Sequence, residues 1–172
     1  ESIEIKIIKT DGDINQNLKL SEIGGKGLFS KKIESELLNK NIDIAVHALK
    51  DLPSIETKGL KADIYLERND PREVLISKNN KNLLELDKYS IVGTSSFRRE
   101  AQLKNLRNDL TTKLIRGNVD TRIKKLEENK FQAIILAFAG IKMLKKEEKI
   151  SQIFSVNEIL PSVGQGIISI QS

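Results

Sequence analysis

The sequence predicts an α/β protein with parallel or mixed sheets and helices on both faces. Short apolar runs alternate with amphipathic segments through most of the chain, and this alternation is typical of such sheets. Hydrophobic residues make up 38% and charged residues 31% of the 172 residues, which is ordinary for a globular protein. A chain of this length forms one or two compact domains with a buried core.

The N-terminal part contains three expected elements. Residues 2–9 alternate between apolar and polar side chains, which predicts a strand. A glycine loop at 24–27 precedes apolar residues that fall at helical spacing over 28–38, which predicts an amphipathic helix. The run 42–49 is almost continuously apolar, as expected for a strand that is covered on both faces, and Pro53 ends it.

The rest of the chain alternates between strands and helices. The expected strands are 73–77, 91–93, 114–115, 133–137 and 167–170, and the expected helices are 97–106, 119–128 and a segment from Gly140 toward Lys146. Small residues at 161–166 predict a loop before the last strand.

Composition excludes several kinds of site. The chain has no Cys, which excludes disulfides, thiolate metal sites and cysteine nucleophiles, and we expect no metal centre. No run of about 18 apolar residues exists, so we expect no membrane span. Aromatic residues are only 4%, so stacking platforms for nucleic acid are scarce. The net charge of +5 is compatible with an acidic small molecule or with nucleic acid.

Two arginine-bearing junctions are the most informative feature. Residues 93–99 and 114–122 each have the pattern of a strand end, a tight turn with small polar residues, and a helix start. The N-terminus of a helix attracts anions through its unpaired N–H groups, and a guanidinium matches a carboxylate or phosphate with two parallel hydrogen bonds. Such arginines are otherwise solvated or paired with surface acids, but two junctions in one segment favour a site for a ligand with several negative groups.

Ligands of open α/β sheets bind outside the carboxyl ends of the strands. Several polar residues follow expected strand ends, and we expect them to converge on one crevice; they are Asp51, Ser95, Ser96, Arg98, Arg99 and Arg116. Taken alone, Asp51 fits a turn or cap residue, and His47, inside an apolar strand, fits a core histidine better than a catalytic base.

Six sequence blocks carry a resemblance to a known family. They lie at 25–29, 43–53, 93–99, 116–118 with 121–122, 136–140 and 160–166. Together, in this order and over nearly the whole chain, they resemble the porphobilinogen deaminase (hydroxymethylbilane synthase) family. The resemblance implies a transferase of porphyrin, tetrapyrrole and heme biosynthesis. Its members condense four porphobilinogen molecules head to tail, with release of ammonia, on a dipyrromethane cofactor that is attached to a cysteine, and they form hydroxymethylbilane.

The resemblance also implies roles for individual residues. Asp51 matches the catalytic aspartate, which would stabilise the cation left by loss of ammonia and move protons. The implied cofactor-binding residues are Lys26, Lys50, Asp51, Thr94, Ser95, Ser96, Arg98, Arg99, Arg116 and Gly117. The implied substrate-binding residues are Arg116, Arg122 and Gln165.

The chain departs from the family pattern at three places. It begins after the family's first strand, it stops before the third domain that carries the cofactor-linking cysteine, and Met143 stands where the family usually has an arginine. We therefore expect a fragment that is itself inactive, with two domains that resemble periplasmic binding proteins and a hinge between them. Domain 1 is expected at 1–70 plus 155–172, and domain 2 at 71–154.

The remaining expectations concern partners and location. We expect the small molecule porphobilinogen as substrate, no nucleic acid and no membrane as partner, a monomer when full length, and a cytoplasmic location, although an organellar targeting segment stays open. Two other functions also stay open: a non-catalytic two-domain module that binds a polycarboxylate, and a nucleic-acid binder. A carboxylate at Asp51 among arginines argues against the first, and the interleaving of lysines with acids argues against the second.

Overall fold

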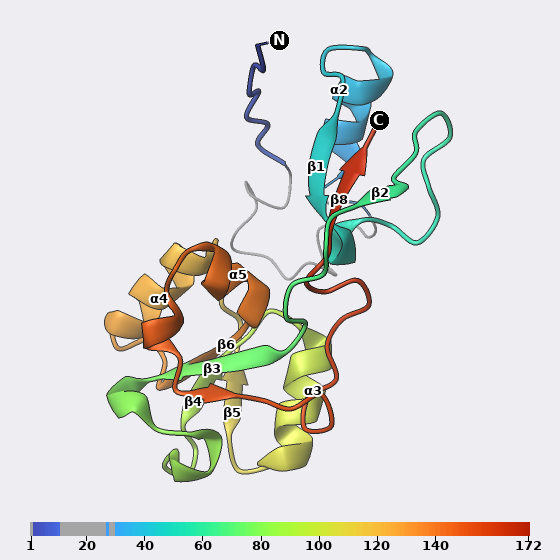
Figure 1. The fold of residues 1–172 in the computed structure, drawn as a ribbon. Coiled ribbons are helices and arrows are strands. Elements are labelled where there is room, and N and C mark those ends of the chain that lie inside the picture. The colour runs from blue at the N-terminus through green and yellow to red at the C-terminus, as the bar shows by residue number, and fades with distance from the viewer. Residues whose placement is uncertain (1, 11–26, 28–29) are drawn as a thin grey trace. The chain divides into compact units, whose positions relative to one another are not determined.

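The computed structural model describes residues 2–10, 27 and 30–172 and divides the chain into two compact units (Figure 1). The first unit comprises Glu1–Arg68 and Ile167–Ser172, and the second comprises Asn69–Gly166. The second unit begins at residue 69, where we expected 71, and ends at residue 166, twelve residues after the expected end at 154. Residues 155–166 group with the second unit because Ile159 is fully buried in its core and Leu160 bonds to the side chain of Gln102.

The first unit contains a three-stranded antiparallel sheet in the order β1-β8-β2. In the part that the structure describes, the strands are β1 (Ala45–Ala48), β2 (Ile64–Tyr65) and β8 (Ile168–Gln171), and the helices are α2 (Lys31–Leu38) and the 3-10 turn η1 (Leu49–Asp51). Helix α2 packs on β1, where Leu37 and Ala45 form a small core with Leu60.

Two expectations for this unit were wrong. Residues 2–10 form no strand, and Ile3, Ile5 and Ile7 are 84–90% exposed, because none of the described strands pairs with them. The strand expected at 42–49 is shorter and is covered on one face only. Burial alternates along it, with Ala45 buried and Val46 64% exposed, because α2 covers a single face of the sheet.

The second unit contains a five-stranded mixed sheet in the order β5-β4-β6-β3-β7. Its strands are β3 (Glu73–Ser77), β4 (Ile91–Gly93), β5 (Thr111–Lys113), β6 (Ala133–Ala137) and β7 (Gln152–Ile153). Strand β4 runs parallel to β5 and β6, whereas β3 runs antiparallel to β6 and β7. The predicted mixed α/β architecture is therefore confirmed.

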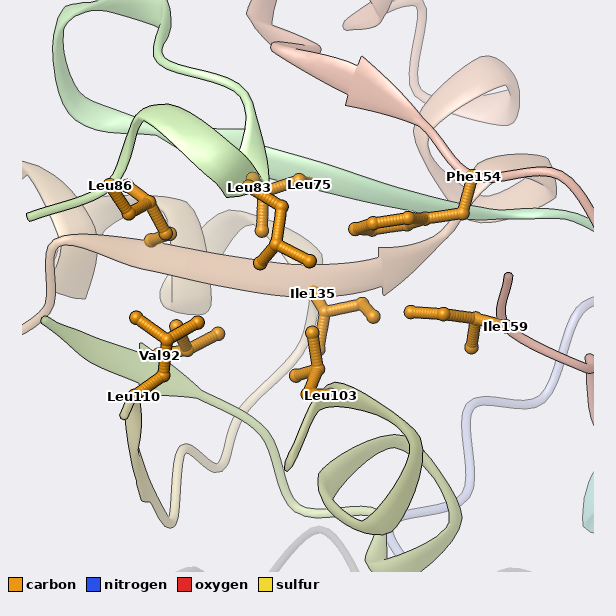
Figure 2. Packing of buried hydrophobic residues seen from close by; sticks show 10 residues of the cluster. Leu75, Leu83, Leu86, Val92, Leu103, Leu110, Ile135, Phe154 and Ile159 are labelled. Atoms are coloured by element: carbon orange, nitrogen blue, oxygen red, sulfur yellow. The ribbon is translucent and has the colours of Figure 1, made fainter. Parts of the chain in front are cut away.

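Helices cover both faces of this sheet, as predicted. The helices are α3 (Phe97–Leu106), α4 (Val119–Glu127) and α5 (Phe138–Met143). Successive residues of a strand point to opposite faces. On one face Leu75 and Ile135 pack with Leu103 of α3 (Figure 2), and on the other Ile134 packs with residues of α4 and α5 such as Ile123 and Ile141.

The expected strand at 114–115 was wrong by three residues. The edge strand β5 is instead the polar segment Thr111–Lys113, whose residues are mostly exposed. Ile115 follows β5 and is buried against Ile123 of α4 and Ile134 of β6. The apolar run 114–115 thus indicated a core contact and not the strand. The other short elements are the 3-10 turns η2 (Lys78–Asn80), η3 (Leu83–Glu85) and η4 (Glu147–Lys149). Among the described residues, no helix combines the length and hydropathy that crossing a bilayer requires.

Candidate functional site: an arginine-lined edge of the second unit

The structure brings the two arginine junctions side by side. Strands β4 and β5 are parallel neighbours, with Gly93 opposite Lys113. The segments that follow the two strands therefore leave the sheet at the same side, that of the strands' carboxyl ends. Beyond the strands, the N–H of Thr94 donates to the carbonyl of Lys113 over 3.0 Å. The hydroxyl of Ser95 donates to the carbonyl of Ile115 over 2.6 Å. The two junctions therefore lie next to each other, and we call residues 94–99 and 115–122 the arginine edge.

The first junction is built to start a helix. Ser96 is the N-cap of α3, and its hydroxyl accepts from the N–H of Arg99 over 3.4 Å. The hydroxyl of Thr94 accepts from the N–H of Ser96 over 3.2 Å. These hydroxyls hold the turn, and their predicted contacts with a ligand stay predictions.

The second junction is held by the helix that follows it. Asn118 caps α4 by accepting from the N–H and the hydroxyl of Thr121, over 2.9 and 2.8 Å. Arg122 donates through Nε to the carbonyl of Gly117 over 2.7 Å, and Lys125 donates to the carbonyl of Arg116 over 2.9 Å. Side chains of α4 therefore hold the backbone of the loop that carries Arg116. Arg116 is only 4% exposed.

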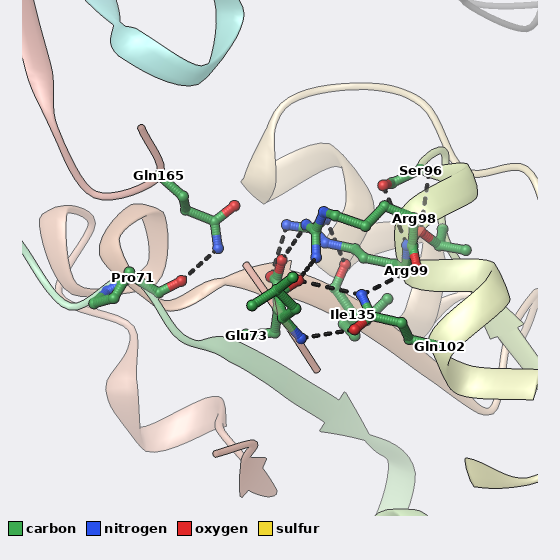
Figure 3. Close-up of polar contacts among 10 residues, drawn as sticks. Pro71, Glu73, Ser96, Arg98, Arg99, Gln102, Ile135 and Gln165 are labelled. Atoms are coloured by element: carbon green, nitrogen blue, oxygen red, sulfur yellow. Dashed lines mark hydrogen bonds and ion pairs between the residues drawn. The ribbon is translucent and has the colours of Figure 1, made fainter. Parts of the chain in front are cut away.

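Arg98 and Arg99 share one buried carboxylate, that of Glu73 at the start of β3 (Figure 3). Nη2 of Arg98 lies 2.5 Å from Oε1 of Glu73, and Nη2 of Arg99 lies 2.8 Å from Oε2. Burial raises the pKa of Glu73, but the charges and hydrogen bonds of Arg99 and Arg98 outweigh it, so the pKa lies below its ordinary value. Glu73 therefore stays ionised at neutral pH.

Sequence reasoning missed Glu73. The signal was a lone acid opening the apolar strand 73–77, where a charge needs a partner because burying an unpaired carboxylate is costly. The partners are 25 and 26 residues away in the sequence, so periodicity could not name them.

Gln165 lies in the second unit and is 1% exposed. Its side-chain amide donates to the carbonyl of Pro71 over 2.7 Å (Figure 3). Next to it, Gly166 has φ of +88°, and a Cβ there would lie 2.4 Å from the carbonyl oxygen of Asn69. The segment that carries Gln165 is thus tied to the segment 69–71. The predicted contact of Gln165 with substrate stays a prediction.

The other predicted site residues lie in the first unit or outside the described residues. Asp51 is exposed and Lys50 is half-buried in η1, which directly follows β1. Lys26 lies outside the described residues. The predicted crevice would join residues of both units, and it stays a prediction.

His47 is a buried core residue, as predicted. Its Nε2 lies 3.1 Å from the side-chain oxygen of Gln171, and the amide of Gln171 donates to Glu34 over 3.2 Å. Burial lowers the pKa of His47, and the bond to Gln171 opposes this only in part. Met143, where the resemblance expects an arginine, ends α5 with 63% of its surface exposed.

The chain matches a family of known proteins over its whole length. The profile described as "Porphobilinogen deaminase, dipyromethane cofactor binding domain" matches residues 1–172. Proteins named porphobilinogen deaminase are 52% identical in Syntrophomonas wolfei and 49% identical in Bacillus subtilis, each over 99% of this chain. The alignments cover 56% and 54% of those proteins, so the chain spans about half the length of the curated relatives it matches.

Among solved structures, the chain is similar to an arginine-specific periplasmic binding protein of Salmonella typhimurium. The sequence identity is 18% and the TM-score 0.42, with 59% of this chain and 50% of that chain covered.

Proposed function

Because the chain belongs to the porphobilinogen deaminase family, we propose that it forms the part of a hydroxymethylbilane synthase that binds the dipyrromethane cofactor and the growing pyrrole chain. The reaction would be the stepwise condensation of four porphobilinogen molecules with release of ammonia. The alternative of a non-catalytic polycarboxylate-binding module gains nothing from the comparisons, since the relatives are named as deaminases.

The observation that carries this proposal is the arginine edge. Porphobilinogen has two carboxylates, so a dipyrromethane has four, and a growing chain accumulates more. Two capped helix starts and their arginines lie at one edge of one sheet, and this donor set suits several carboxylates at once. Arg99 and Arg116 are buried, and burial strengthens a charge-assisted hydrogen bond relative to the same bond in water.

The residues present fit the dipyrromethane by their chemistry. Its carboxylates would be held by guanidinium, ammonium and hydroxyl groups of the residues predicted above: Lys26, Lys50, Thr94, Ser95, Ser96, Arg98, Arg99, Arg116 and Arg122. When bound, the cofactor supplies the primer on which the pyrrole chain grows. The chain contains no cysteine, so its own residues would contribute non-covalent contacts.

Asp51 is proposed as the catalytic carboxylate. Loss of ammonia from porphobilinogen leaves a cation of the azafulvene type, and a fixed carboxylate beside the pyrrole nitrogens stabilises that charge. The same group can take up and return a proton during deamination. Asp51 is exposed at the end of η1 and so is accessible to such a substrate.

We propose a cytoplasmic monomer that acts on porphobilinogen without nucleic acid or membrane. The support is the family of the bacterial relatives and the small, highly charged substrate that the family name implies.

The test is a calorimetric titration of the chain with a dipyrromethane that carries four carboxylates. Arg116→Ala and Arg122→Ala should each weaken binding by about 1.5–3 kcal/mol, or roughly 10- to 150-fold, the range for charge-assisted hydrogen bonds. Lys104→Ala is the matched control, because Lys104 lies at the other end of α3, where it pairs with Glu100 on the surface. Unchanged affinity in both arginine variants would contradict the proposal.

A further inference from the structure

Glu73 occupies a position that is fixed from both sides. Glu73 is the first residue of β3 and lies opposite Ala137 of β6. Its backbone carbonyl accepts from the N–H of Phe154 over 3.0 Å. Its side chain is 0% exposed. The carboxylate therefore has little freedom, and no solvent competes for its two oxygens.

Two consecutive arginines of α3 converge on this carboxylate. Neighbouring residues of a helix point about 100° apart, so Arg98 and Arg99 would ordinarily diverge. Each oxygen of Glu73 instead takes one guanidinium, and each guanidinium is also anchored to a carbonyl: Arg98 to that of Leu160, and Arg99 to that of Ile135 over 3.2 Å. Figure 3 shows both guanidinium groups gathered around Glu73.

The cluster keeps donors and positive charge for a further anion. Two cations and one carboxylate leave a net charge of +1. A guanidinium has five N–H donors, and the contacts with Glu73 and the hydrogen bonds to the two carbonyls use only some of them. The Arg98 side chain is 27% exposed, whereas that of Arg99 is 8% exposed and its buried Nε has no hydrogen-bond acceptor among the described residues.

We propose that Glu73 is a positioning residue that holds Arg98 and Arg99 together as one preformed fork for a carboxylate of the pyrrole ligand. This inference rests on the proposed function for the identity of the ligand. Glu73 acts through the arginines and does not itself touch the ligand. Without it, two guanidinium groups would repel each other, and their ordering would have to come from the binding energy of the ligand.

Two substitutions separate charge from shape. Glu73→Gln keeps the size but presents one oxygen and one amide NH₂, so it can accept from one guanidinium while its NH₂ faces the other. Glu73→Asp keeps both oxygens and the charge on a backbone that two neighbouring strands hold, and it should restore the fork. Asp109→Asn is the control, because it breaks another arginine–carboxylate pair, with Arg107 at 2.7 Å, at the far end of α3.

The first readout needs no ligand. Nitrogen NMR of arginine side chains measures rotation about the Nε–Cζ bond, with signals assigned through Arg98→Lys and Arg99→Lys. We expect slow rotation for both arginines in the wild type and in Asp109→Asn, and faster rotation of at least one in Glu73→Gln. Free rotation of Arg98 in the wild type would overturn the proposal even if Glu73→Gln does not fold.

The second readout is affinity for the dipyrromethane with four carboxylates. Glu73→Gln should bind at least about tenfold more weakly, whereas Glu73→Asp should stay within about threefold and Asp109→Asn within about twofold of the wild type. A folded Glu73→Gln with wild-type affinity, or an equal loss in Glu73→Asp, would overturn the positioning role. A wild-type chain that does not bind the probe would instead contradict the proposed function, and the rotation measurement would still decide whether Glu73 orders the two arginines.

Discussion

Gly117→Ala should damage the arginine edge through the backbone. Gly117 sits between Arg116 and the N-cap of α4 with φ of +111°, a conformation that L side chains rarely adopt. A Cβ at this position would lie 2.6 Å from Cγ2 and 2.7 Å from Cβ of Thr121. Thr121 is in the first turn of α4 and has a branched side chain, so it cannot move aside by changing a distant torsion.

The expected cost follows from these contacts. Placing an alanine at positive φ costs about 1–2 kcal/mol. Displacing Thr121 weakens its 2.8 Å hydroxyl bond to Asn118, and a hydrogen bond contributes about 0.5–1.5 kcal/mol. We therefore expect the free energy of unfolding to fall by about 1.5–3.5 kcal/mol. Affinity for the dipyrromethane should fall as well, since Arg122 is anchored to the carbonyl of Gly117.

Urea denaturation followed by circular dichroism measures this cost. Gly140→Ala is the matched control: Gly140 lies inside α5, and its added Cβ would approach nothing closer than 3.7 Å. Because alanine is the better helix former, this control should match the wild type or exceed its stability by up to about 1 kcal/mol. A Gly117→Ala variant as stable as Gly140→Ala would refute the reasoning about the loop.

Two further predictions concern the carboxylate of the reaction and the response to pH. Asp51→Asn, tested in a form of the protein that turns over porphobilinogen, should slow single-turnover release of ammonia by about 10²-fold or more. The free energy of unfolding should change little, because Asp51 is exposed. Near-normal turnover would show that the carboxylate takes no part in the chemistry. The folded state lowers the pKa of His47, so the unfolded chain takes up the proton first, and the free energy of unfolding should fall as the pH drops below about 6.5. Urea midpoints measured between pH 5 and 7.5 should show this dependence on pH in the wild type and a weaker one in His47→Gln. The folded state also lowers the pKa of Glu73, so its contribution is present above the unfolded pKa of about 4.5 and is lost as the pH falls through the lower, folded value; a Glu73→Gln variant that loses stability as steeply as the wild type in this range would contradict that assignment.

The second unit was largely predictable because its strands carry their own burial pattern. Strand β3 is apolar from Val74 to Ile76 and β6 is apolar throughout, because helices cover both faces of the sheet. Helix α3 begins and ends where the sequence predicted. Residues 2–9 show why alternation alone is insufficient. An alternating segment becomes a strand only when a neighbour satisfies its backbone groups, and no described strand does so.

The site was predictable where it depends on strand direction and not where it depends on distant pairs. Adjacent parallel strands bring their carboxyl ends to one edge, which placed the junctions of Arg98 and Arg116 together. The convergence of Arg98 and Arg99 on Glu73 depends on the order of strands in the sheet, since β3 and β4 are separated by β6. Spacing along the sequence does not contain that information.

A map of the residues that the ligand contacts would test most directly whether the arginine edge binds its carboxylates. Backbone amide signals of the chain would be followed by NMR while the dipyrromethane with four carboxylates is added, with its neutral tetramethyl ester as control. We expect the acid to shift the signals of residues 94–99 and 115–122 and the ester to leave them unchanged. Shifts confined to other parts of the chain, or equal shifts with the ester, would contradict the claim that the arginine edge binds the carboxylates.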